Sequence, residues 1–315
     1  MLAQLTMATS WNTVTALRFL SSVDPGILWG ASLLVALLYS LRTARREGLD
    51  PRAMYWAGAS AILFGLWGGY LLGFVYYGTD GRPWAWLRFW SGGRAEYGGL
   101  IAGMFAIALY LQIRKLTFLR YADAIVPAVA LGAAIGRLGC FLNGDDFGTR
   151  STLLWAVTFP SGTEAYADHF NRGWIASSDP LSLSIHPVQL YTSLFALMLF
   201  AFLAWSRPSR TGLRFASFLV IYGAGRFADQ HFRGDFQPIL GPLSLTQLIS
   251  LLLVAGGAVI WVSVRGATRG VADFRMTDLP ATVADKSVST EPASPYVQPP
   301  LTPKFSESFE REAEC

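Results

Sequence analysis

Long apolar runs dominate the chain and alternate with shorter polar segments. About 20 apolar residues in a helix cross a bilayer core of about 30 Å. Seven runs approach that length, although the first, third and fifth are short or interrupted. The pattern therefore predicts an all-α integral membrane protein with seven transmembrane helices. The predicted spans are residues 26–42, 55–76, 97–113, 123–142, 188–205, 215–233 and 244–264.

The composition supports a membrane protein. Of 315 residues, 52% are hydrophobic and 15% charged, with a mean hydropathy of +0.37, whereas a soluble domain has about 25% charged residues. Eleven tryptophans and twelve tyrosines suit the two interfacial belts. The net charge of +4 needs no nucleic-acid partner, because membrane topology explains the basic residues. No cleavable signal peptide is expected, because residues 1–24 lack a basic region followed by an apolar one.

Basic residues collect in the segments on one predicted face. These segments are 42–54, 114–122, 206–214 and the one after the last span. By the positive-inside rule this face is cytoplasmic, although loop 77–96 and segment 143–187 also contain arginines. The N-terminus is therefore predicted to be extracytoplasmic and the C-terminus cytoplasmic.

Two segments outside the predicted spans are long. Segment 143–187 is predicted to form a small irregular extracytoplasmic head, with one short strand at Trp155–Pro160. The tail, residues 276–315, has six prolines and a net charge of −4, so it buries too little apolar surface to order itself. The predicted organisation is a membrane domain, residues 1–275, followed by a disordered cytoplasmic tail. No internal repeat suggests a transporter built from two halves.

The run Gly136–Gly148 contains polar residues that are costly in lipid. Arg137 lies near the end of the fourth span, and Asn143 and Asp145 follow it. Ionisable groups at membrane depth mark a functional site, and four glycines suggest a backbone that approaches something closely. The run therefore predicts a polar ligand held at the lipid surface.

Further arginines lie near the end of the sixth span. Arg226 and Arg233 lie seven residues apart in this span and therefore on nearly the same helix face, with Gln230 between them on that face and Asp229 on another. Together with Arg137 they would repel one another unless an anion lay between them, and a phospholipid phosphate suits arginine. The alternative is that these arginine side chains extend to the membrane–water interface or pair with neighbouring acidic residues. Those acids are Asp145, Asp146, Asp229 and Asp235.

Two other motifs begin spans on the same face. Tyr97 precedes Gly98 and Gly99, a pair that either exposes backbone N–H groups to an anion or allows a close helix–helix contact. His186 precedes Pro187 and is either a structural hydrogen bonder or a base. Spacing alone does not decide either question.

Taken in order, these motifs resemble those of the prolipoprotein diacylglyceryl transferase family. Gly136–Gly148 resembles the family run G-R-x-G-N-F-x-N-G-E-x-x-G, and Trp90–Leu100 resembles W-x-G-G followed by H-G-G-L. His186–Tyr191 resembles H-P-x-Q-L-Y, and Tyr222–Arg233 resembles Y-G-x-x-R followed by F-R. The order, the spacing and the seven spans all fit, and the resemblance covers about Gly26–Arg265.

The resemblance implies an enzyme of lipoprotein biosynthesis in the bacterial inner membrane. Such an enzyme moves the diacylglyceryl group of phosphatidylglycerol to the cysteine thiol of a prolipoprotein signal peptide, and glycerol phosphate leaves. No metal or soluble cofactor is implied. Arg137 and Arg226 match the family's essential arginines, which would stabilise the leaving phosphate, and Asp145 and Tyr97 complete the candidate catalytic set. The candidate substrate-binding residues are Asn143, Gly148, Gly98, Gly99, Arg233, Gln230 and His186.

Several positions depart from the family pattern. Tyr97 replaces a histidine and is a poor base, with a reference pKa near ~10. Cys140, beside Arg137, is either a packed residue or a reactive thiol. The departures leave Asp145 or His186 as alternative bases, and they also fit relaxed substrate demands. The departing residues are Trp29, Tyr97, Cys140, Asp145, Thr192 and Gln230.

Three function classes follow. The first is an active diacylglyceryl transferase, and the second is a non-catalytic paralogue of the same fold that binds anionic phospholipid. The third, a transporter or channel, predicts polar residues deep inside several spans. The polar groups instead gather at one predicted interface, which argues against this class.

Overall fold

The computed structural model describes residues 24–77 and 96–277, and these residues are mostly helical. Contacts divide the chain into two units, residues 1–268 and 269–315. The first unit holds every described element except the last turns of α9. The N-terminal segment, the Trp90–Gly93 part of one motif and nearly all of the predicted tail lie outside the described residues.

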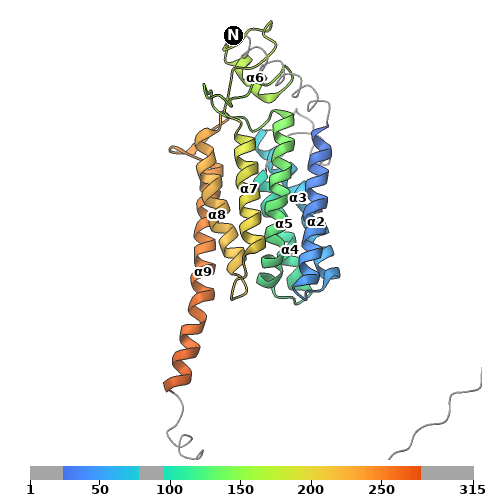
Figure 1. Cartoon of the computed structure of the whole chain (residues 1–315), viewed down its shortest axis with the longest axis vertical. Helices are drawn as coiled ribbons and strands as arrows, with labels where there is room; N and C mark the ends of the chain where they lie inside the picture. The colour runs from blue at the N-terminus through green and yellow to red at the C-terminus, as the bar shows by residue number, and fades with distance from the viewer. Residues whose placement is uncertain (1–23, 78–95, 278–315) are drawn as a thin grey trace, which may run out of the picture. The chain divides into compact units, whose positions relative to one another are not determined.

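A long helix lies at each predicted span (Figure 1). Five described helices, α2, α3, α5, α7 and α9, are long and apolar enough to cross a membrane. In α4 the apolar stretch is shorter, and α8 has 17 residues. The result is an all-α membrane protein. The bounds are α2 (Pro25–Arg46), α3 (Pro51–Tyr77), α4 (Glu96–Ile113), α5 (Phe118–Asn143), α7 (Val188–Trp205), α8 (Leu213–Asp229) and α9 (Leu245–Thr277).

α5 is central, with α2 and α7 packed along it (Figure 1). Small residues bring α2 and α5 close: a Cβ on Gly132 would lie 3.2 Å from the carbonyl oxygen of Ser32, and Gly139 leaves room for the Trp29 ring. Such close approach suits membrane helices, because dispersion rather than water exclusion holds them together. Apolar side chains of α5, α7 and α8 form a buried core beside this contact.

The Gly98–Gly99 pair makes a helix–helix contact. A Cβ on Gly98 would lie 2.3 Å from the carbonyl oxygen of Gly68, and one on Gly99 would lie 3.1 Å from that of Gly65. Of the two alternatives for this pair, the structure has the close packing of α4 on α3.

The predicted head contains a helix that the sequence pattern did not indicate. α6 (Glu164–Asn171) is capped by the hydroxyl of Thr163, which accepts from the N–H of Tyr166 at 3.4 Å. The strand expected at Trp155–Pro160 is reduced to isolated bridges at Val157 and Pro160. Four buried residues hold the head together: Phe147, Phe159, Ala165 and Ile185.

The sixth span ends earlier than predicted. α8 stops at Asp229, a 3-10 turn, η2 (Gln230–Phe232), follows, and Arg233 has extended backbone with φ −75° and ψ 131°. The prediction that Arg226 and Arg233 share one helix face is therefore wrong. The physical reason is backbone pairing with the head, since Phe232 and Gly234 bond to residues 147–149. A two-stranded hairpin of β1 (Pro238–Leu240) and β2 (Leu243–Ser244) then leads into α9.

Candidate functional site

The end of α5 positions the central arginine. Arg137 lies in the last two turns, and the helix ends at Gly144, whose φ of 69° suits a residue without a Cβ. The chain then reverses through Asp146, whose own φ is 54°. This turn brings the carboxylate of Asp146 back over the helix end and onto the Arg137 side chain.

Asp146 is shared by two arginines from distant parts of the chain. One oxygen accepts from Arg137 and the other from Arg233. Both arginine side chains are about 10% exposed, while that of Asp146 is 31% exposed. Arg233 also pairs with Asp235, through Nε at 2.7 Å and through a second nitrogen. The cluster therefore joins the end of α5 to the segment after α8.

Arg226 lies near this cluster with a partner of its own. It pairs with Asp229, one helical turn further along α8, and the two side chains are 6% and 10% exposed. Asp229 was expected to point elsewhere, and this pairing corrects that expectation. The arginines thus pair with neighbouring acids in the structure, as the alternative interpretation held.

The charges around Asp146 decide its ionisation. Burial disfavours its charged form, but the guanidiniums of Arg233, Arg137 and Arg226 hold its pKa well below the usual range. Asp146 is therefore a fixed anion that orients the arginines. From the sequence, Asp145 was expected in the catalytic set, and Asp146 was named only among the possible partners of the arginines.

Asp145 has the opposite character. Burial and then repulsion by Asp146 raise its pKa above the ordinary value. One carboxyl oxygen accepts from the side-chain N–H of Asn143 at 2.7 Å, and the other is buried. The thiol of Cys140 also hydrogen-bonds to this carboxyl. Two adjacent carboxylates whose pKa values are pushed apart are suited to different roles, one electrostatic and one in proton transfer.

Gln189 fixes the backbone beside this carboxyl. Its side-chain Nε2 donates to the carbonyl oxygen of Asp145 at 2.7 Å, and the residue is 1% exposed. Sequence reasoning quoted Gln189 in a motif but did not place it in the site. A buried glutamine in the first turn of a span was the available signal, because a buried polar side chain needs a partner.

Beside the arginines, three backbone segments pair with one another and form a wall of the site. Thr149 donates its N–H to the carbonyl oxygen of Phe232 at 2.8 Å, and His186 donates its N–H to the carbonyl oxygen of Thr149 at 3.0 Å. A Cβ on Gly148 would lie 2.3 Å from the carbonyl oxygen of His186, so only glycine lets these segments meet. The half-buried His186 ring faces Tyr191, with Nδ1 3.3 Å from the hydroxyl. His186 and Gly148 therefore belong to the wall.

Tyr97 and Gln230 make their contacts at the start of α9. The hydroxyl of Tyr97 donates to the carbonyl oxygen of Thr246 at 3.5 Å, and the residue is 6% exposed. The side-chain oxygen of Gln230 accepts from the hydroxyl of Ser244 at 3.2 Å. The carbonyl oxygen of Gln230 also accepts from the backbone N–H of Arg233 at 3.3 Å.

A further acidic residue lies close enough to Asp145, Asp146 and Asp235 to be affected by their charges. Glu164 begins α6, and its neighbour Ala165 donates an N–H to the Gly144 carbonyl at 3.2 Å. Although much of the residue is exposed, withdrawal of its carboxyl from water and repulsion by Asp235, Asp145 and Asp146 raise the pKa of Glu164 to about 7. The sequence held no signal for this residue, because α6 itself was not predicted.

One group of possible metal ligands occurs in the described part of the chain. The ligand atoms of Cys140, Asp145 and Asp146 lie within 4.8 Å of one another. Both oxygens of Asp146 are already engaged by arginines, which leaves few free donors for a cation. The arrangement instead combines fixed cations with a carboxyl of raised pKa, a combination that stabilises a phosphate anion and accepts a proton.

Comparisons with known proteins point to one family. The model of the family described as "Prolipoprotein diacylglyceryl transferase" matches residues 25–263. A phosphatidylglycerol–prolipoprotein diacylglyceryl transferase of Synechococcus elongatus is 30% identical over 260 residues, which cover 79% of this chain and 85% of that protein. A protein of the same name from Symbiobacterium thermophilum is 31% identical over 255 residues, covering 78% and 90%.

Proposed function

Because this chain belongs to the prolipoprotein diacylglyceryl transferase family, we propose that it transfers the diacylglyceryl group of phosphatidylglycerol to the lipobox cysteine of prolipoproteins. The thiolate sulfur bonds to the terminal glycerol carbon of the diacylglyceryl group. The bond from that carbon to the phosphate oxygen breaks, and glycerol phosphate leaves. The observation that carries the proposal is the set of buried arginines around Asp146.

The arginines act on the leaving phosphate. Negative charge moves from the thiolate to the phosphate oxygen as the carbon–oxygen bond breaks, so fixed cations stabilise the transition state more than the ground state. Arg137 and Arg226 bind this phosphate, and Arg233 supports them. Asp146 keeps Arg137 and Arg233 in one orientation before substrate arrives, which reduces reorganisation during the reaction.

Asp145 accepts the thiol proton. The thiolate is the nucleophile, and a carboxyl with a raised pKa is a better base near neutral pH than an ordinary aspartate. Its second carboxyl oxygen is withdrawn from water, where it can take up that proton. Tyr97, whose hydroxyl donates to the carbonyl oxygen of Thr246, links the start of α4 to the start of α9.

The remaining candidates shape the substrate pocket. Asn143 is exposed and donates to Asp145, so it lies where a head group would enter. Gly148 and His186 form the wall described above, while Gly98, Gly99 and Gln230 support it through helix packing.

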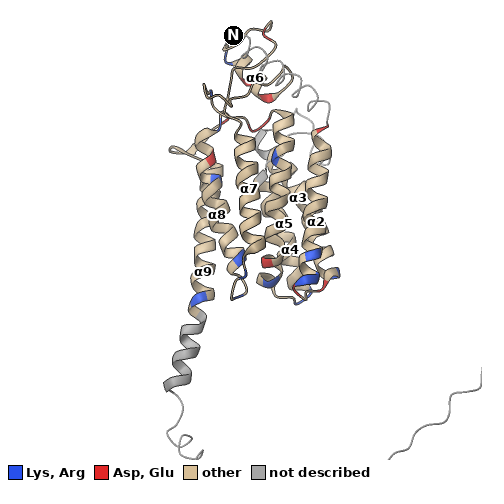
Figure 2. Cartoon of the chain, viewed as in Figure 1, with Lys and Arg blue, Asp and Glu red and all other residues tan. Residues whose placement is uncertain are grey.

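The proposed topology has seven spans in the bacterial inner membrane. Charged residues lie near the helix ends and leave the middle of the bundle apolar (Figure 2). The N-terminus and the arginine cluster are extracytoplasmic and the C-terminus is cytoplasmic, following the basic loops.

The test uses purified protein in micelles containing phosphatidylglycerol, with a fluorescent lipobox peptide. Wild type should shift the peptide's mobility, and Arg137→Ala should abolish the shift. Arg150→Ala, an exposed arginine of the head, is the matched control and should retain it. No shift with wild type, while phosphatidylglycerol still binds, would instead favour the lipid-binding paralogue. A gain of transfer in Tyr97→His would then identify a damaged enzyme.

A further inference from the structure

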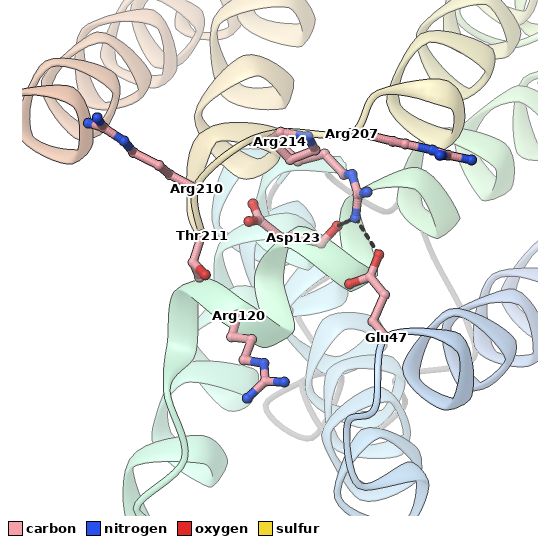
Figure 3. A pocket seen from close by; sticks show the side chains of 8 residues that line it. Glu47, Arg120, Asp123, Arg207, Arg210, Thr211 and Arg214 are labelled. Carbon is pink, nitrogen blue, oxygen red and sulfur yellow. Dashed lines mark hydrogen bonds and ion pairs between the residues drawn. The ribbon is translucent and has the colours of Figure 1, made fainter. Parts of the chain in front are cut away.

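A charged cavity lies at the other end of α5 from Arg137. It has a volume of about 320 Å³ and is lined by the α2–α3 turn, the start of α5 and the α7–α8 connection (Figure 3). At about 1.5 Å per helical residue, Asp123 and Arg137 are roughly 21 Å apart along the helix axis. The cavity is therefore separate from the candidate active site. Its charged lining residues are Glu47, Arg120, Asp123, Arg207, Arg210 and Arg214.

Asp123 is already engaged. Its two oxygens accept from the backbone N–H groups of Gly212 at 2.6 Å and Phe215 at 2.7 Å, and the residue is 6% exposed. These N–H groups at the start of α8 have no partner within the helix, so Asp123 acts as a cap supplied by another helix. Both oxygens of its carboxylate are therefore engaged by the start of α8.

Glu47 is engaged as well. Arg214 donates to its carboxylate at 2.7 Å, and donates to the carbonyl oxygens of Asp123 and Ser206, both at 3.1 Å. Figure 3 shows Arg214 reaching between Asp123 and Glu47. This group forms the floor of the cavity and ties α2, α5 and α8 together.

Three arginines of the lining have no acid partner within the described residues. Arg210 donates to the carbonyl oxygens of Val264 and Arg265, each at 2.9 Å, and so keeps its full positive charge. Arg120 and Arg207 are exposed and extend on opposite sides of the Arg214–Glu47 pair (Figure 3). The lining therefore has four arginines against two acids.

From this cavity we propose a binding site for the head group of an anionic phospholipid, in the leaflet at this end of the helices. The cavity lies where α5 and α8 begin, which is the level of lipid head groups for helices that cross a bilayer. Guanidinium groups bind phosphate with two parallel hydrogen bonds, and basic pockets between membrane helices hold anionic head groups. Its volume is at the lower end of the range for small-ligand sites, which suits a head group whose acyl chains stay in lipid.

The test counts lipids that stay bound to the full-length protein in native mass spectrometry. Wild type and Arg120→Gln/Arg207→Gln are each titrated with phosphatidylglycerol, cardiolipin and phosphatidylcholine. Losing two charged hydrogen-bond donors should raise the dissociation constant of one bound anionic lipid molecule at least about tenfold. The binding of phosphatidylcholine should stay unchanged. Arg46→Gln/Arg114→Gln removes the same charge from exposed arginines outside the cavity and should behave as wild type.

Transferase activity and the melting temperature report on folding in each variant. Neither should change in the double variant, because both side chains are exposed. If the cavity variant and the control variant lose bound lipid equally, the proposed site is wrong. The basic loops would then attract anionic lipid only in a general way. Competition by soluble glycerol phosphate as strong as that of the lipid would assign the cavity to a free anion.

Discussion

At the scale of single residues, two neighbouring aspartates have pKa values shifted in opposite directions. Asp146 is held ionised by the arginines around it, and Asp145 is held towards its protonated form by burial and by the charge of Asp146. The separation follows from the turn after α5, which directs one carboxylate onto the arginines and the other towards Asn143. Catalysis in this account requires both roles together.

Replacing Asp145 tests its role in proton transfer. Asp145→Asn should lower the turnover number about 10²- to 10⁴-fold without weakening phosphatidylglycerol binding, while Asp50→Asn, on the opposite end of the bundle, should have no effect. The base must be ionised to act, and its pKa is raised. Wild-type activity should therefore fall on acidification at a higher pH than an ordinary aspartate would give. A pH–rate profile unchanged by Asp145→Asn would contradict this role.

Replacing Asp146 tests the electrostatic role. Asp146→Asn leaves two buried guanidiniums without their shared anion, and should cost on the order of 1–3 kcal/mol, less than the loss of a fully buried pair because Asp146 is 31% exposed. Its lowered pKa means that this stability is present above the unfolded value near ~4 and is lost as pH falls below it. Thermal unfolding of both proteins should therefore converge on acidification. Equal melting temperatures at neutral pH would refute the idea.

At the scale of helices, glycine contacts set the spacing of the bundle. α3 and α4 approach so closely that a Cβ on Gly98 meets the carbonyl oxygen of Gly68. Gly98→Ala should force the helices apart and destabilise the protein by about 1–3 kcal/mol. Gly256→Ala in α9, where nothing lies within 4 Å of the new Cβ, should leave stability unchanged or slightly raised. The two variants are compared by their melting temperatures in detergent. Similar values would show that the α3–α4 contact is loose.

The helices were predictable from sequence, but their ends were less so. Apolar runs placed most of the long helices within a few residues, because membrane length and helical rise together fix the pattern. The exception is α9, which continues to Thr277, well beyond the predicted end at residue 264. The end of α8 at Asp229 was missed, because backbone bonds between Gly234 and Phe147 are not visible in local sequence. The eight residues of α6 were missed for a similar reason, since the helix depends on packing in the head.

The candidate site was predicted in part. Sequence motifs identified Arg137, Arg226 and Arg233, but not which acid would face them. The choice of Asp146 over Asp145 depends on the backbone dihedrals that follow Gly144, and two adjacent acids look equivalent in sequence. Gln189 and Glu164 were missed because their roles come from contacts between distant segments.

At the scale of the whole molecule, the proposed topology puts the arginine cluster on the extracytoplasmic side of the membrane. In a variant without native cysteines, Leu154→Cys, at a fully exposed position of the head, should react with a membrane-impermeant maleimide on intact cells. Arg45→Cys, at an exposed position in the last turn of α2, should react only after permeabilisation. The opposite pattern would place the arginine cluster in the cytoplasm and exclude the proposed function.

The central claim is that the arginine cluster stabilises a glycerol phosphate leaving group during transfer to a thiol. The most direct measurement incubates the purified protein with phosphatidylglycerol labelled in its head-group glycerol and with a lipobox peptide, and quantifies both products by mass spectrometry. The account predicts a diacylglyceryl thioether and labelled glycerol phosphate in equal amounts, and neither product with Arg137→Ala or with a peptide whose cysteine is serine. Thioether formation that persists in Arg137→Ala, or glycerol phosphate released without thioether, would contradict it.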